Sequence, residues 1–184
     1  MEDSILLQHE IDTLILLVEV IVAFVAFSSI VASVKMTMGK AVTPHQQLLV
    51  HFFTESGMLA ASVCLLPLVL LGFIEDIVLL TRLTCAYTLV AVSLYLAWYL
   101  RRRFRIKAPT PLGSAFVIIG WVIWVPILLT TAAGKIWAQD LAVIVALGFW
   151  SISGSTIIFV TFLATFVDDA SVELEGKGTT HLAS

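Results

Sequence analysis

A histidine and a glutamate one helical turn apart are the residues of this sequence best suited to proton chemistry. His51 and Glu55 are four positions apart in a largely apolar stretch, so a helix would place both side chains on one face. A carboxyl group beside an imidazole can relay protons or hold a small cation. We expect no basic side chain of another span at the depth of Glu55, which leaves His51 as its nearest partner.

Hydroxyl groups on neighbouring spans are expected near Glu55. Antiparallel packing would bring Ser28 and Ser29 from the first span and Thr161 from the last span to this depth. Two interpretations follow. Glu55 either joins helices through hydrogen bonds in a dry bundle, or lines a water-filled path that exchanges protons or cations with the cytoplasm.

Glu19 and Arg82 form a second candidate pair. Glu19 lies six residues into the first expected span and Arg82 five residues into the third, so both should lie about 7 to 9 Å from one surface at the helical rise per residue. A charge inside the bilayer needs compensation, which favours an ion pair between the two helices. Alternatively, Arg82 extends toward Glu75 or Asp76 at the helix end, and Glu19 is left for proton or cation handling.

Two serines of the last expected span form a small polar stripe. Ser151 and Ser155 are four positions apart and would lie on one helical face. Small residues let membrane helices approach closely, and a pore lining is the alternative role for the stripe.

Helices that cross a membrane must position all of these residues. The 184-residue chain is 60% hydrophobic and 12% charged, with a mean hydropathy of +1.05, whereas soluble domains carry about 25% charged residues. This composition excludes a soluble enzyme, and a net charge of −3 without a basic face argues against nucleic-acid binding. We expect an all-α integral membrane protein with five transmembrane helices, because five apolar runs are long enough to span a bilayer. They are residues 13–34, 48–72, 77–100, 112–132 and 141–167.

Cationic residues predict the orientation. Lys35 and Lys40 lie in the first connection, and the third connection holds a larger basic cluster. Connections rich in Lys and Arg remain in the cytoplasm, so we expect the N-terminus outside, the C-terminus inside and a plasma (inner) membrane location. The basic cluster is interpreted mainly as a topology anchor, with contact to anionic lipid as a secondary role. Its members are Arg101, Arg102, Arg103, Arg105 and Lys107.

Two connections end in similar sequences. Residues 40–44 read KAVTP and residues 107–111 read KAPTP. Thr followed by Pro is typical of a helix start, so the match is either a parallel duplication of two helical hairpins or an independent recurrence. Residues 168–184 are acidic and rich in Gly and Thr, which predicts a flexible cytoplasmic tail.

No cofactor, metal site or catalytic motif is expected. The four histidines are spread over opposite membrane faces and the tail, and no known nucleophile or phosphate-binding motif occurs. We therefore expect a non-enzymatic, homo-oligomeric protein that resembles a channel or transporter for protons or small ions. The alternative is a non-conducting scaffold or accessory subunit of a membrane complex, whose embedded charges fix its packing against a partner.

Overall fold

The computed structural model describes residues 2–37, 44–106, 112–136 and 141–180, and these residues form five α-helices and no strand. Each helix contains a stretch long and apolar enough to cross a membrane. The all-helical prediction with five such helices is confirmed, and these features identify the chain as an integral membrane protein. The helices are α1 (Glu2–Thr37), α2 (Pro44–Leu70), α3 (Ile77–Ile106), α4 (Leu112–Ala132) and α5 (Ala142–Thr180).

Local hydrogen bonds define several helix ends. The Asp76 carboxylate accepts hydrogen bonds from the backbone N–H groups of Val78 (2.9 Å) and Leu79 (3.3 Å) at the start of α3, as an N-cap residue does. Beyond α4, Gly134 adopts a positive φ of 72°, a conformation that glycine enters at little cost. The start of α5 is held by α1, because the Glu10 carboxylate accepts a hydrogen bond from Leu141 N–H (3.1 Å).

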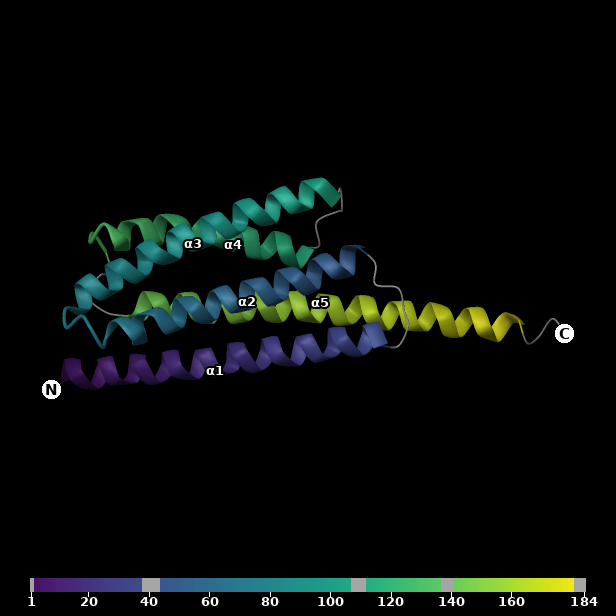
Figure 1. The fold of residues 1–184 in the computed structure, drawn as a ribbon, viewed down its shortest axis with the longest axis horizontal. Coiled ribbons are helices and arrows are strands. Elements are labelled where there is room, and N and C mark those ends of the chain that lie inside the picture. The colour runs from purple at the N-terminus through teal and green to yellow at the C-terminus, as the bar shows by residue number, and fades with distance from the viewer. Residues whose placement is uncertain (1, 38–43, 107–111, 137–140, 181–184) are drawn as a thin grey trace.

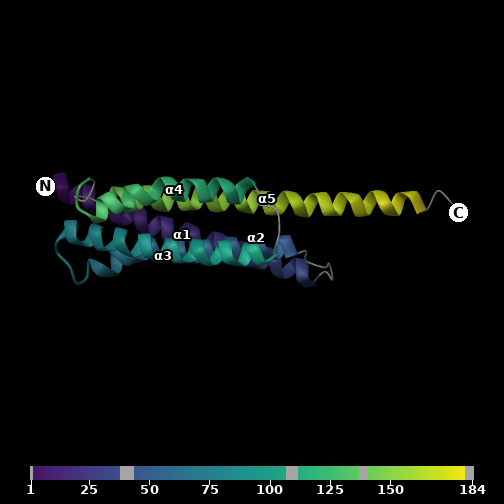
Figure 2. The same cartoon turned by 90° about the horizontal axis from the view of Figure 1, so that it is seen from above.

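The helices form an elongated bundle with α1 at one edge. Figure 1 shows α2 and α5 between α1 and the α3–α4 pair, and Figure 2 shows the same bundle from a second side. Within the described residues, α1 contacts α2 and α5 but neither α3 nor α4. One side of α1 is therefore open. We call the end of the bundle that holds residues 101–105 the arginine end, and the opposite end, which holds the α2–α3 turn, the turn end.

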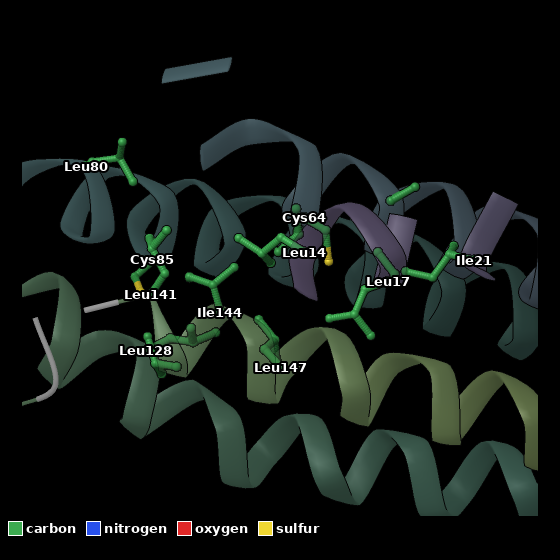
Figure 3. Close-up of a cluster of buried hydrophobic side chains, with 14 residues drawn as sticks. Leu14, Leu17, Ile21, Cys64, Leu80, Cys85, Leu128, Leu141, Ile144 and Leu147 are labelled. Atoms are coloured by element: carbon green, nitrogen blue, oxygen red, sulfur yellow. The ribbon is translucent and has the colours of Figure 1, made fainter. Parts of the chain in front are cut away.

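Tight apolar packing holds the bundle together toward the turn end. Leu14 and Leu17 from α1 meet Cys64 from α2 and Ile144 from α5 in one buried cluster (Figure 3). Gly148 permits this approach, since a Cβ there would lie 2.9 Å from the Cys64 sulfur. Large apolar side chains in such a cluster fix the relative positions of helices.

Four helices extend beyond their predicted apolar runs, and the smallest extension is in α2, which begins at Pro44 rather than at residue 48. α1 begins at Glu2 rather than at residue 13, and its membrane stretch covers Ile5–Val31. A hydrogen bond from the Gln8 amide to the Asp12 carboxylate (3.0 Å) supports its first turns, in which neither Gly nor Pro occurs. α3 runs on to Ile106, and α5 runs to Thr180.

The extension of α5 falls on the predicted tail. The α5 backbone is helical through residues 168–180 and projects past the other helices (Figure 1), and its flexibility stays a prediction. Residues 40–43 and 107–111, including Lys107, lie outside the described part of the chain. The proposed duplication around the two similar sequences therefore stays a prediction too.

Candidate functional site

Glu55 has a cationic partner that the sequence analysis did not predict. The Arg102 guanidinium lies 3.2 Å from the Glu55 carboxylate, whereas His51 Nδ1 lies 3.9 Å from the same oxygen. The expectation that no basic residue reaches this depth is wrong. α3 continues as a helix past residue 100, so Arg102 stands on a helix beside α2 and its long side chain reaches inward. About a third of each side chain, 35% for Glu55 and 29% for Arg102, is exposed.

Aromatic side chains pack beside this ion pair, toward the bundle centre. The Tyr95 hydroxyl donates a hydrogen bond to the Phe52 carbonyl (3.2 Å), and the Phe52 and Tyr99 rings lie 4.5 Å apart. Tyr95, Tyr99 and Arg102 are spaced i, i+4, i+7, which places them on one face of α3. This spacing is a signal in the sequence that could have identified the partner of Glu55.

The predicted hydroxyl partners of Glu55 instead bind their own helices. Within the described residues, Ser28 donates to the carbonyl of Phe24 (2.7 Å) and Ser29 donates to that of Val25 (2.9 Å). Thr161 likewise donates to a carbonyl four residues earlier (2.8 Å). Such bonds satisfy the hydroxyl proton within one helix, so these three residues form no bonded chain with Glu55.

The predicted serine stripe borders a small cavity whose lining is mostly apolar. Ser151 and Ser155 line a cavity of about 20 Å³ together with Ser56 and Tyr95, which is room for roughly one water molecule. The nearby Trp150 indole nitrogen is buried and has no hydrogen-bond partner among the described residues.

Arg82 does not pair with Glu19. Its Nε donates a hydrogen bond to the Ala132 carbonyl (3.0 Å), and its guanidinium lies against Gly134 beyond α4. The predicted ion pair is wrong because α1 and α3 do not contact each other in the described residues. The depths differ as well: Glu19 follows Ile5 by fourteen residues, whereas Arg82 is five residues into α3, which gives about 21 Å and 8 Å along the helices.

Glu19 lies on the open side of α1. Its side chain is exposed and makes no hydrogen bond or ion pair with the described residues. It stands near the middle of the membrane stretch Ile5–Val31. Asp12, Glu19, Ala26 and Ser33 recur at intervals of seven residues and are all exposed; we call these four residues the acidic line. Exposed apolar side chains flank it, among them Leu16, Val22, Phe27 and Ile30.

The arginines near the end of α3 divide between two sides of the helix. Arg102 faces Glu55, and Arg103 is partly buried and has a contact of its own. Arg101 and Arg105 are exposed and form no hydrogen bond or ion pair within the described part of the chain. The basic cluster is therefore not one unit, because Arg102 faces the bundle whereas Arg101 and Arg105 are exposed.

The described residues contain no group of three or more His, Cys, Asp or Glu side chains arranged to hold a metal ion. Cys64 and Cys85 are both free and buried among apolar side chains. Comparison of the chain with protein-family models, with curated proteins and with solved structures finds no match.

Proposed function

We propose that this chain is one subunit of a homo-oligomeric channel- or transporter-like protein for protons or small cations, and that α1 lines the path between subunits. The observation that carries the proposal is Glu19, an exposed carboxyl group without a described partner near the middle of a membrane-spanning helix. The proposal moves the predicted path from Glu55, which an arginine neutralises, to the open face of α1.

The exposure of Glu19 favours assembly. An acidic side chain at the centre of a membrane helix costs roughly 2.5 to 3.5 kcal/mol, and such residues face protein or water rather than lipid. In a single chain the α1 face that carries Glu19 is uncovered. A second copy would cover it, and the small residues Ala26 and Ser33 on the same line would let two α1 helices approach closely.

The spacing of the acidic line favours a path along the symmetry axis. Residues seven apart face the common axis when helices pack with the left-handed crossing of coiled coils. Asp12 and Glu19 from each subunit would then form two acidic rings about 10.5 Å apart along the helix. Rings of carboxylates are a common source of cation selectivity in channels.

We infer the orientation from the arginine end. Its cations support a cytoplasmic location for residues 101–105 and an outside location for the start of α1. When intact cells are treated with a membrane-impermeant maleimide, we expect labelling of a cysteine introduced at position 3 and no labelling of one introduced at position 178. The opposite labelling pattern would show that the protein has the reverse orientation.

Ion flux into vesicles tests the proposed path. Purified protein in liposomes should pass protons or monovalent cations down an imposed gradient, and Glu19→Gln should reduce the flux at least severalfold. Glu75→Gln is the matched control, since Glu75 is an exposed acidic residue in the turn between α2 and α3. Equal flux in wild type and Glu19→Gln, or no flux from protein shown to be oligomeric, would contradict the proposal.

A non-conducting scaffold or accessory subunit is the second candidate. It is favoured by the neutralisation of Glu55 by Arg102 and by the hydroxyls that bond within their own helices. In that case Glu19 would meet a Lys or Arg on the helix of another protein. Ion-tight vesicles, together with a partner whose co-purification is lost in Glu19→Gln, would favour this function over the first.

A further inference from the structure

We propose that Arg101 and Arg105 form a binding site for the phosphate group of an anionic phospholipid on the outward side of α3. The two residues are four positions apart, so their side chains lie on the same helical face, with about 5 to 6 Å between their Cβ atoms. Guanidinium groups bind phosphate oxygens through paired N–H donors. This inference is independent of the proposed ion path.

The like charges of Arg101 and Arg105 repel each other unless an anion lies near them. The acidic residue Glu55 has a described side chain near this end of the bundle, and it already pairs with Arg102. Arg101 and Arg105 have no acidic partner among the described residues. Two like charges at i, i+4 destabilise a helix, and a phosphate between them would remove this repulsion.

The surface that leads to these arginines fits a lipid rather than a soluble phosphate. Leu94, Trp98, Arg101 and Arg105 continue one line along α3, with side-chain exposures of 67% for Leu94 and 63% for Trp98. This order matches a phospholipid. The apolar residue would lie beside the acyl chain, the tryptophan at the interfacial region and the two cations at the headgroup. A soluble phosphate would gain nothing from the exposed Leu94 and Trp98.

Selective retention of lipid tests the site. The protein is incorporated into nanodiscs of phosphatidylcholine with a minor fraction of phosphatidylglycerol, then extracted gently, and the lipids that remain bound are quantified by native mass spectrometry. We expect wild type to retain phosphatidylglycerol in excess over its bulk fraction. The preference should fall about fivefold for each arginine replaced by Gln, so the double variant Arg101→Gln/Arg105→Gln should lose nearly all of it.

Two further variants distinguish a built site from general basicity. Lys135→Gln removes an exposed cation beyond α4, at the opposite end of the bundle, and should leave the preference unchanged. Arg101→Lys/Arg105→Lys keeps the charges but removes the guanidinium geometry, so this variant should retain only part of the preference for phosphatidylglycerol. Thermal unfolding checks that each variant is folded.

Two results would overturn the proposal. One is a preference in the double Gln variant equal to that of the wild type. The other is displacement of phosphatidylglycerol by millimolar glycerol phosphate or inorganic phosphate, because that result would assign the arginines to a soluble anion instead of a lipid.

Discussion

Glu55 and Glu19 are two carboxyl groups at membrane depth in opposite environments. Glu55 faces another helix of the same chain, lies 3.2 Å from Arg102 and is about one third exposed. Glu19 faces away from the bundle and has no described partner. The first carboxylate is compensated by the fold of one chain, whereas the second requires something outside it. We propose that the first serves stability and that the second serves assembly or passage of ions.

The surroundings of the two residues support the same division. Phe52 and Tyr99, near Glu55, belong to one buried cluster with Phe53 and Phe159, and Phe24 from α1 packs against this cluster. Glu19 adjoins exposed apolar side chains on a helix with one uncovered side. Removal of a contact near Glu55 should therefore change the stability of the isolated chain, while removal of one near Glu19 should change the association of chains.

Loss of the cation beside Glu55 has the largest expected effect. Arg102→Gln strands a carboxylate between helices, and removal of one partner of a fully buried pair costs about 3 to 5 kcal/mol. Partial exposure of both side chains reduces this cost through solvent screening, so we expect a loss of about 1 to 3 kcal/mol in the free energy of unfolding. Glu55→Gln should cost less, because the remaining arginine can extend to the membrane surface.

Denaturant titration in mild detergent measures these changes. The double variant Glu55→Gln/Arg102→Gln should regain part of the stability that Arg102→Gln loses, which identifies the two side chains as coupled. Lys135→Gln is the matched control, since Lys135 is exposed and its side chain has no described partner. An equal loss in Arg102→Gln and Lys135→Gln would remove the distinction between the two carboxyl groups.

The structure also shows which features of this arrangement can be predicted from sequence. Run length and hydropathy are local properties, and they predicted all five helices. The partner of Glu55 cannot be recognised from the apolar run, because the run stops at residue 100 while the helix continues to Ile106 and includes Arg102.

The wrong partner for Glu19 has a related cause. A depth counted from residue 13 places Glu19 near one surface, but α1 starts at Glu2, which puts Glu19 near the middle of the membrane stretch. A matched depth does not by itself establish contact between α1 and α3. Which helices touch depends on side-chain packing across the whole bundle, and a single sequence does not contain that information in its local patterns.

Association of α1 with a second copy has the next largest expected effect. Ala26→Cys places a thiol on the acidic line, and oxidation in vesicles should give disulfide-linked dimers at least severalfold more efficiently than Val90→Cys. Val90 is exposed on α3 at 59%, so it controls for lipid-facing cysteines in general. The native cysteines are both buried and need not be replaced. Efficient dimers from Val90→Cys alone, measured on a non-reducing gel, would show that α3 rather than α1 faces the second copy.

The smallest expected effect concerns the hydrogen bond beside Glu55. Tyr95→Phe removes the hydroxyl that donates to the Phe52 carbonyl (3.2 Å) but keeps the ring packed against Phe52 and Tyr99. Hydrogen bonds between membrane helices contribute about 0.6 kcal/mol on average, so we expect a loss of that size in the denaturant titration.

Tyr87→Phe provides the comparison for this last variant. Its hydroxyl lies 3.3 Å from the Ser62 hydroxyl, and its side chain is 41% exposed, so the loss should be smaller than for Tyr95→Phe. A Tyr95→Phe loss as large as that of Arg102→Gln would mean that the hydrogen bond from Tyr95 to the Phe52 carbonyl joins α2 to α3 as strongly as the ion pair does. The contrast between Glu55 and Glu19 would then not depend on the ion pair alone.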